Sequence, residues 1–159
     1  MTVAPITPPA VECGFWIWSQ AQAKTSRCLA PGPARSSLRL RRILLIDDTP
    51  EIAELLTFAL SDRAFTVFAV GFTDTVNELI LEQKVDALVL DCSSFDMSES
   101  LFDTVRDHPN HAELPVVIIS DTPEEADASL RSRDARKVLL IPKPFTGAQV
   151  ARALDELLK

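Results

Sequence analysis

Acidic, hydroxyl and amine side chains follow four short apolar runs of this chain, each at the point where the run stops. The first run ends at Asp47 and Asp48, and the second ends at Asp91. The third stops at Ser120, and the fourth stops just before Lys143. If the runs are parallel strands of one sheet, their carboxyl ends share the edge where open α/β sheets bind ligands. Carboxylates, a hydroxyl and an amine would then meet in one crevice.

These carboxylates could hold a divalent cation, because acids that share a site repel one another. Mg²⁺ prefers hard oxygen ligands and keeps waters and phosphate oxygens in its shell. The amine of Lys143 could bind a phosphoryl oxygen as a point charge, and the hydroxyl of Ser120 could donate to another. One carboxylate could then attack a phosphoryl group and hold it as an acyl phosphate. Asp91 is the best candidate nucleophile because it stands alone, whereas Asp47 and Asp48 are paired and suit metal binding.

Strand-like and helix-like patterns alternate from Arg42 onward, which is typical of βα units around a parallel sheet. We expect five of each, and hence an α/β fold of the (βα)5 type, a doubly wound, five-stranded parallel sheet. The predicted strands cover residues 43–46, 65–70, 86–90, 115–119 and about 137–141. Three predicted helices begin at cap residues, which are Thr49, Thr73 or Asp74, and Thr122. The third helix is expected from about Ser98 to Asp107 and the last from Thr146, and the first ends near Ser61.

Composition favours a single globular domain, since 47% of the 159 residues are hydrophobic and 25% are charged. Residues 1–42 hold six Lys or Arg against one acid, whereas residues 43–159 hold ten against twenty-two. Such an acidic domain repels nucleic acid, so we expect no direct binding of DNA or RNA. The basic stretch 35–42 is more simply a solvated lead-in to the first strand. No apolar run is long enough to cross a membrane, and we expect no membrane association.

Residues 1–40 are rich in proline and lack a sustained period, which predicts a disordered or poorly structured tail before a domain at 42–159. A secretory signal is disfavoured, because no positive charge precedes the apolar stretch 15–18 and Glu12 adjoins it. The three cysteines, Cys13, Cys28 and Cys92, have no metal-site spacing and indicate a reducing compartment. We therefore expect a cytoplasmic protein. The two histidines, at 108 and 111, are expected in a loop rather than on a metal.

Four motifs in order resemble the receiver domain of two-component response regulators over residues 42 to 158. They are Leu45-Ile46-Asp47-Asp48, Leu88-Val89-Leu90-Asp91, Ile118-Ile119-Ser120 and Lys143-Pro144-Phe145. Each motif is weak alone, but the four at these separations make a specific signal. The resemblance implies a flavodoxin-like fold with Asp91 as phosphoacceptor. It also implies Mg²⁺ bound directly by Asp48 and Asp91, mainly through water by Asp47, and by the backbone carbonyl of Ser93.

The resemblance further implies that Ser120 and Lys143 bind the phosphoryl oxygens and that the Lys143-Pro144 peptide is cis. The phosphoryl donor would be a phosphohistidine on a histidine kinase or phosphotransfer protein, and the output a contact with a downstream protein target. Such a domain would not be an enzyme, apart from slow self-dephosphorylation. No further domain follows residue 158, so we expect a stand-alone receiver. The family commonly uses its fourth helix, fifth strand and fifth helix for partners, a face that here includes Glu125, Ser129, Arg133 and Arg152.

Four residues depart from the family's pattern. Phe95 and Glu99 replace the proline and glycine that usually shape the loop after the acceptor. Asp121 replaces the small residue after the hydroxyl and would repel an anionic donor. Leu140 stands where the switch aromatic falls, so a flip of an aromatic ring cannot carry the signal.

Three other interpretations remain open at this stage. A degenerate receiver could act as a phosphorylation-independent docking module, which the four departures favour. The protein could also be a phosphatase with an aspartyl nucleophile. That family needs a second acid two residues after the nucleophile, and Ser93 occupies this position relative to Asp91. Finally, Asp47 or Asp48 could simply cap the first helix and Asp91 end its strand, although this does not explain residues 143–145.

Overall fold

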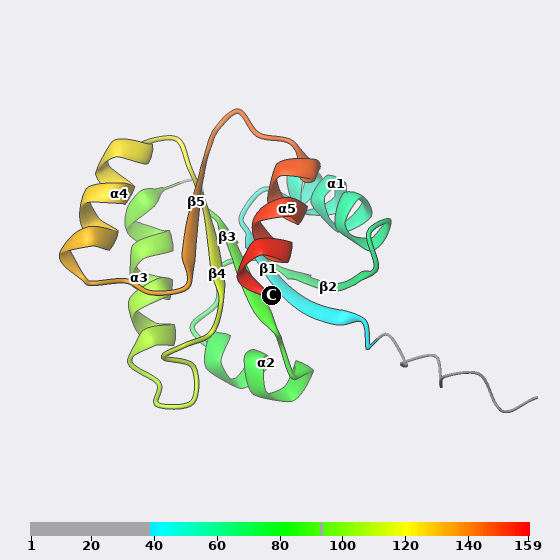
Figure 1. Cartoon of the computed structure of the whole chain (residues 1–159), viewed down its shortest axis with the longest axis horizontal. Coiled ribbons are helices and arrows are strands. Elements are labelled where there is room, and N and C mark those ends of the chain that lie inside the picture. The colour runs from blue at the N-terminus through cyan, green and yellow to red at the C-terminus, as the bar shows by residue number, and fades with distance from the viewer. Residues whose placement is uncertain (1–38, 93) are drawn as a thin grey trace, which may run out of the picture. The chain divides into compact units, whose positions relative to one another are not determined.

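The structure is a computed structural model that describes residues 39–92 and 94–159. Strands and helices alternate strictly along this part of the chain (Figure 1). The elements are β1 (Arg41–Asp47), α1 (Pro50–Ser61), β2 (Phe65–Val70), α2 (Val76–Gln83), β3 (Ala87–Asp91), α3 (Phe95–Arg106), β4 (Val116–Ser120), α4 (Pro123–Ser132), β5 (Val138–Pro142) and α5 (Gly147–Leu157). The (βα)5 alternation predicted from the sequence is confirmed.

All strand pairs are parallel, and the sheet order is β2-β1-β3-β4-β5. Helices α1 and α5 cover one face of this sheet, and α2, α3 and α4 cover the other (Figure 1). This is the flavodoxin-like strand order, whose topological switch point lies between β1 and β3. Ligands of such sheets bind outside the carboxyl ends of the strands at that point.

The central strands are buried on both faces because their apolar runs are continuous. Ile43 and Leu45 of β1 belong to the core cluster beneath α1 and α5. Leu44 and Ile46 belong to the second cluster, which includes residues of α2 and α3. Successive side chains of a strand point to opposite faces, so one apolar run fills both layers of core.

Strands β3, β4 and β5 each end one residue later than the sequence predicts. The parallel ladder continues through the polar residues, since Asp91 is in register with Asp47 and Ser120 with Pro142. Asp91 and Ser120 are therefore the last residues of their strands.

The helix starts follow the cap residues with two exceptions. Thr49 and Thr122 are N-caps as predicted. Thr146, where the last helix was expected to start, is its N-cap and forms a capping box with Gln149. The N-cap of α2 is Thr75, whose backbone N–H donates to the hydroxyl of Thr73. Helix α3 begins at residue 95 with Ser94 as N-cap, whereas residue 98 was expected. Ser98 is instead a buried residue of the helix, 1% exposed.

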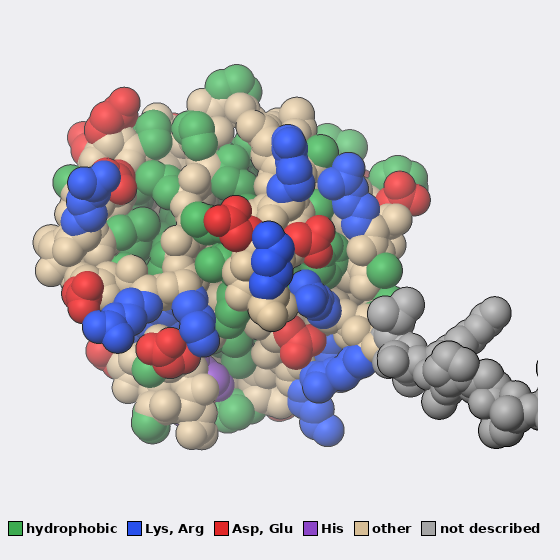
Figure 2. All heavy atoms as spheres, viewed as in Figure 1, with side chains coloured by type: hydrophobic (Ala, Val, Ile, Leu, Met, Phe, Trp, Pro, Cys, Tyr) green, Lys and Arg blue, Asp and Glu red, His purple; other side chains and the backbone are tan. Residues whose placement is uncertain are grey.

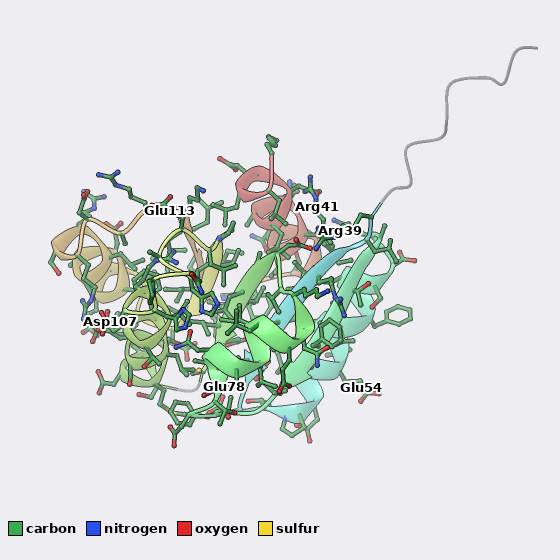
Figure 3. The ribbon with its side chains drawn as sticks, turned by 90° about the horizontal axis from the view of Figure 1, so that it is seen from below. Arg39, Arg41, Glu54, Glu78, Asp107 and Glu113 are labelled. Atoms are coloured by element: carbon green, nitrogen blue, oxygen red, sulfur yellow. The ribbon has the colours of Figure 1, made fainter. Side chains whose placement is uncertain are left out.

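Figure 3 shows Arg39 and Arg41 where β1 begins, and Asp107 and Glu113 on the α3 side of the molecule. Glu54 of α1 and Glu78 of α2 lie on the surface of their helices. No helix of residues 39–92 and 94–159 is long and apolar enough to span a membrane. The predicted tail at 1–40, apart from its last two residues, lies outside the described residues, as do Cys13 and Cys28.

Candidate functional site

The register of the sheet brings the carboxylates of β1 and β3 together at the switch point. Asp47 and Asp91 are register partners at the ends of neighbouring strands. Both side chains are buried, with 4% and 2% of their surface exposed. Asp48 follows Asp47 and is partly buried, and its charge acts on both of these acids. The register therefore places Asp47 and Asp91 side by side, and Asp48 acts on both through its charge.

Lys143 reaches Asp91 from the loop after β5. Its Nζ lies 2.7 Å from Oδ1 of Asp91. The backbone N–H of Lys143 donates to the carbonyl oxygen of Ser120 at 2.9 Å, which fixes the start of this loop against the end of β4. The Lys143-Pro144 peptide bond is cis, as predicted. The amine and the candidate acceptor thus form an ion pair in the described structure.

Ser120 and Asp121 occupy the end of β4. The hydroxyl of Ser120 accepts a hydrogen bond from the backbone N–H of Thr122 at 3.1 Å, and this serine is 4% exposed. An oxygen that accepts in this way keeps its proton for donation to another acceptor. The carboxylate of Asp121 is 63% exposed and lies 3.7 Å from the amine of Lys143. Lys143 therefore lies between an inner and an outer carboxylate.

Burial controls the ionisation of the inner acids. It raises the pKa of Asp47 from 3.8 to about 6, against the hydrogen bond that its Oδ1 accepts from the Thr49 backbone at 2.8 Å. Repulsion from Asp91 and Asp48 adds to this rise. Burial also raises the pKa of Asp91, although the ammonium of Lys143 opposes the shift. For Lys143, burial is outweighed by Asp91 and Asp121, which raise the pKa of the amine. The carboxylates thus carry a cost of ionisation that a cation would remove.

The oxygens that remain suit a hard cation. Oδ2 of Asp47 and Oδ2 of Asp91 are buried without a hydrogen-bond partner among the described residues. Within the described ranges, no group of three or more His, Cys, Asp or Glu side chains is arranged to hold a metal by itself. Mg²⁺ does not need such a cage, because it keeps several waters and takes one or two protein carboxylates. The predicted ligand Ser93 lies outside the described residues, so its carbonyl stays a prediction.

Two of the unusual residues have clear structural roles. Glu99, on α3, binds Ser129 of α4 and Arg133, the C-cap residue of α4. Leu140, in β5, is partly buried against the core cluster beneath α2 and α3. Phe95 is the first residue of α3 and is half-buried. Hence the segment after Ser94 is helical even though the proline and the glycine are missing.

A pocket of about 580 Å³ adjoins the site, and its position could not be found from the strand motifs. Lys143 and Asp121 line it beside apolar side chains of α1. Leu55, on its wall, is 67% exposed. The complete lining is Ile52, Leu55, Leu56, Asp121, Lys143, Pro144, Phe145 and Gly147. The sequence holds one indication of this pocket, because α1 carries more apolar residues than its buried face accommodates.

A comparison with known sequences finds a relative that this chain matches over part of the relative's length. No protein-family model matches the chain. Over 120 residues, 75% of this chain, it is 29% identical to the transcriptional regulatory protein GltR of Pseudomonas aeruginosa. The chain spans about half of that relative, 49% of its length.

Solved structures share the fold closely. A sensor protein from Polaromonas sp. JS666 superposes with a TM-score of 0.66 at 23% identity, covering 74% of this chain and 95% of that one. A response regulator receiver protein from Sinorhizobium medicae WSM419 gives 0.60 at 24% identity, covering 77% and 97%. With the strand order and the four strand ends, these similarities define the class: the chain has the fold of a response regulator receiver domain.

Proposed function

We propose that the protein is a phosphorylation-controlled receiver in two-component signalling, with Asp91 as the acceptor. The observation that supports this most directly is the contact of Lys143 with Asp91, 2.7 Å between Nζ and Oδ1. It sets a cation beside the one carboxylate that stands alone at the end of β3. The receiver fold supports this interpretation of the pair. The partners and the output of the whole protein are likewise part of what we propose.

In the proposed reaction, an oxygen of Asp91 attacks the phosphorus of a phosphohistidine on a histidine kinase or phosphotransfer protein. The P–O bond forms, the P–N bond breaks, and the imidazole leaves with a proton from solvent. Lys143 would move from the carboxylate to a phosphoryl oxygen, and the hydroxyl of Ser120 would donate to a second one. Mg²⁺, held directly by Asp48, Asp91 and the carbonyl of Ser93 and mainly through water by Asp47, would neutralise the remaining phosphoryl charge.

The buried, unpartnered oxygens support the metal part of this proposal. Oδ2 of Asp47 and Oδ2 of Asp91 gain no hydrogen bond from the described protein, and burying a charged oxygen without a partner is costly. A bound cation compensates for that cost directly. We place the protein in the cytoplasm, where histidine kinases transfer their phosphoryl groups, and we propose at most slow self-dephosphorylation as its own chemistry.

The test is incubation with acetyl phosphate in millimolar Mg²⁺. The mass of the intact protein reports the added phosphoryl group, and its stability in acid and loss in base identify an acyl phosphate. One phosphoryl group should be added to the wild type and none to Asp91→Asn. Asp96→Asn is the matched control, because Asp96 is exposed on α3 and its loss changes the charge equally. Label that persists in Asp91→Asn, or requires no Mg²⁺, would contradict the assignment.

A second candidate is a degenerate receiver that docks a partner without phosphorylation. The observation in its favour is the exposed Asp121 beside Lys143, because a carboxylate there repels an incoming phosphoryl donor. A wild type that takes no label from acetyl phosphate and shows no response to beryllofluoride would support this candidate over the first. Multiple turnover of small phosphate esters would instead support a phosphatase.

A further inference from the structure

Helices α3 and α4 begin directly after the two strands that carry the acceptor and the hydroxyl. Helix α3 follows Asp91 with its N-cap at Ser94, and α4 follows Ser120 with its N-cap at Thr122. The hydroxyl of Ser120 itself accepts from the backbone N–H of Thr122. A shift of either strand end is therefore passed first to one of these helices, which lie on the same face of the sheet (Figure 1).

A network of polar side chains ties the two helices together, with Arg133 at its centre. Its Nε lies 2.9 Å from Oδ1 of Asp103, and its Nη2 lies 3.1 Å from Oδ2 of the same carboxylate. Its Nη1 lies 2.7 Å from Oε1 of Glu99, one turn earlier on α3. The hydroxyl of Ser129 donates to the same Glu99 oxygen. We call these four residues the α3–α4 clamp.

The interactions in the clamp are stronger than those of an ordinary surface ion pair. Arg133 grips Asp103 with two parallel hydrogen bonds, the fork arrangement that fixes orientation as well as distance. Its side chain is 31% exposed and that of Glu99 is 27% exposed, so both are partly shielded from water. Isolated exposed pairs contribute little, whereas bidentate pairs within a network contribute more.

Helix α4 has little else to hold it. Its buried residue is Ala126, and Leu130 is partly buried against the core cluster. By contrast, α5 buries Val150, Ala151, Ala153 and Leu154. Figure 2 shows acidic and basic side chains mixed with apolar ones on the face that carries α4 and β5. Since few apolar contacts anchor α4, polar contacts decide how freely it moves.

We propose that the α3–α4 clamp makes α3 and α4 move as one body and prevents α4 from shifting alone when Asp91 is modified. The inference rests on the proposed function, because it concerns what modification of Asp91 changes. Glu99 supplies one of the two carboxylates of the clamp. It stands at a position where the family's pattern has a glycine, which could not form these contacts. The structural change on phosphorylation is then confined to the site loops, and the α4 surface keeps one conformation.

Hydrogen exchange of the α4 amides in the unmodified protein tests the clamp itself. In Arg133→Met the α4 amides should exchange roughly tenfold faster, since loss of a networked pair of about 1.4 kcal/mol corresponds to a factor of ten. Arg131→Met is the matched control, because Arg131 pairs with Asp127 within α4, 2.8 Å apart, and its side chain is 79% exposed. Its α4 exchange should stay near the wild-type rate. Equal exchange in the two variants would overturn the clamp.

A second variant separates the clamp from a general loss of stability. Glu99→Gln with Asp103→Asn removes the two carboxylate charges that Arg133 contacts on α3 and leaves Arg133 in place, so it should accelerate α4 exchange in the same way. The amides of α5 serve as the internal reference, because global destabilisation would accelerate them as well. If α5 accelerates as much as α4 in both variants, the clamp does not act locally and the proposal is wrong.

The regulatory part is tested by beryllofluoride with Mg²⁺, followed through backbone amide shifts. In the wild type the shifted amides should lie near Asp91, Ser120 and Lys143, with α4 little changed. In Arg133→Met they should extend through α4, and in Arg131→Met they should match the wild type. Shifts throughout α4 of the wild type would overturn the proposal. A wild type with no shifts at the site would overturn the proposed function and its regulation together, while exchange still decides the clamp.

Discussion

Lys143 and Asp91 form a partly buried ion pair, with Nζ 2.7 Å from Oδ1, although one follows β5 and the other ends β3, more than fifty positions earlier. The pair exists because Ser120, between them in the sheet, accepts from the Lys143 backbone and is in register with Pro142. The amine is thus positioned by the backbone of β4 before any phosphoryl group arrives. Its side chain is 27% exposed, so solvent reaches part of it.

Removing one partner of this pair should cost more stability than removing both. Lys143→Met leaves the carboxylate of Asp91 buried without its cation and should destabilise the protein by about 1–3 kcal/mol in urea unfolding. The double variant Asp91→Asn with Lys143→Met should recover most of that loss, because the buried charge is gone. Additive effects in this double-mutant cycle would show that the two side chains do not interact.

Asp47 should make the metal-free protein less stable as the pH rises. Its folded pKa of about 6 lies above the unfolded value of 3.8, so the folded state holds the proton more tightly between these values. Stability from this residue is therefore present at low pH and is lost as the pH rises through about 4 to 6. Near neutral pH and in EDTA, Asp47→Asn should be more stable than the wild type by about 3 kcal/mol, at 1.36 kcal/mol per pKa unit.

Mg²⁺ provides the control for that prediction. Near neutral pH it should stabilise the wild type, because it binds the folded carboxylates and not the unfolded chain. The gain should shrink as the pH falls through about 6, where protons compete for Asp47. Asp47→Asn should gain little from Mg²⁺ at any pH. Equal stabilisation of both proteins would place the cation elsewhere.

Asp121→Ala should accelerate labelling by acetyl phosphate. The side chain is 63% exposed and lies 3.7 Å from the Lys143 amine, so it both repels the donor and competes for the cation. The gain should be about two- to fivefold at low salt and should decline as salt screens the charge. Asp134→Ala removes an equally negative, 88% exposed side chain that pairs with Arg136, and should leave the rate unchanged. An unchanged or slower rate in Asp121→Ala would contradict the role.

Acid should weaken the packing of α2 through His111. Its Nδ1 bonds Oδ1 of Asn77 at 2.7 Å, and its Nε2 is buried without a described partner. Burial lowers the pKa of His111 below its ordinary 6.5, with His108 adding to the shift. The unfolded chain therefore binds the proton first, and stability is lost as the pH falls below 6.5. His111→Gln should flatten this part of the stability profile in urea unfolding, whereas His108→Gln should keep most of it.

The site was predictable from the sequence because it depends on strand ends. Parallel strands with continuous apolar runs stop at the same edge, so Asp47, Asp91 and Ser120 had to meet once the runs were recognised. The cis peptide after Lys143 came from the resemblance of residues 143–145 and not from a physical derivation. The predicted strands β3, β4 and β5 each stopped one residue too early. Hydropathy shows where apolar residues stop, whereas the ladder of backbone hydrogen bonds continues into the next residue.

Side-chain contacts between distant elements were not predictable in the same way. Ser129 and Arg133 appeared from sequence as part of a partner-binding face, yet they contact α3 through Glu99. Nothing local in the sequence identifies which of several exposed acids an arginine will meet. Similarly, His111 was expected in a loop and does lie in one, but it is 3% exposed and bonded to Asn77. The first contact depends on how α3 and α4 pack, and the second on how the loop after α3 packs against α2. Hydropathy alone determines neither.

Gly147 lets the start of α5 approach α1 without a side chain. A Cβ placed on Gly147 would overlap the Cβ of Ala59, so the helices could not keep their separation. Gly147→Ala should destabilise the protein by about 1–3 kcal/mol, the usual cost of overpacking a close contact. It should also alter the neighbouring pocket, because Gly147 and Phe145 line it beside Lys143.

The matching change on α1 makes the overlap testable as a pair. Ala59→Gly removes the opposing Cβ and should cost about 1 kcal/mol through helix propensity alone. In the double variant the two losses should not add, because the new methyl of residue 147 occupies the space that residue 59 has vacated. Urea unfolding of the four proteins measures this coupling. If the double variant is as unstable as the sum of the single ones, Gly147 is not required for the approach of α5 to α1.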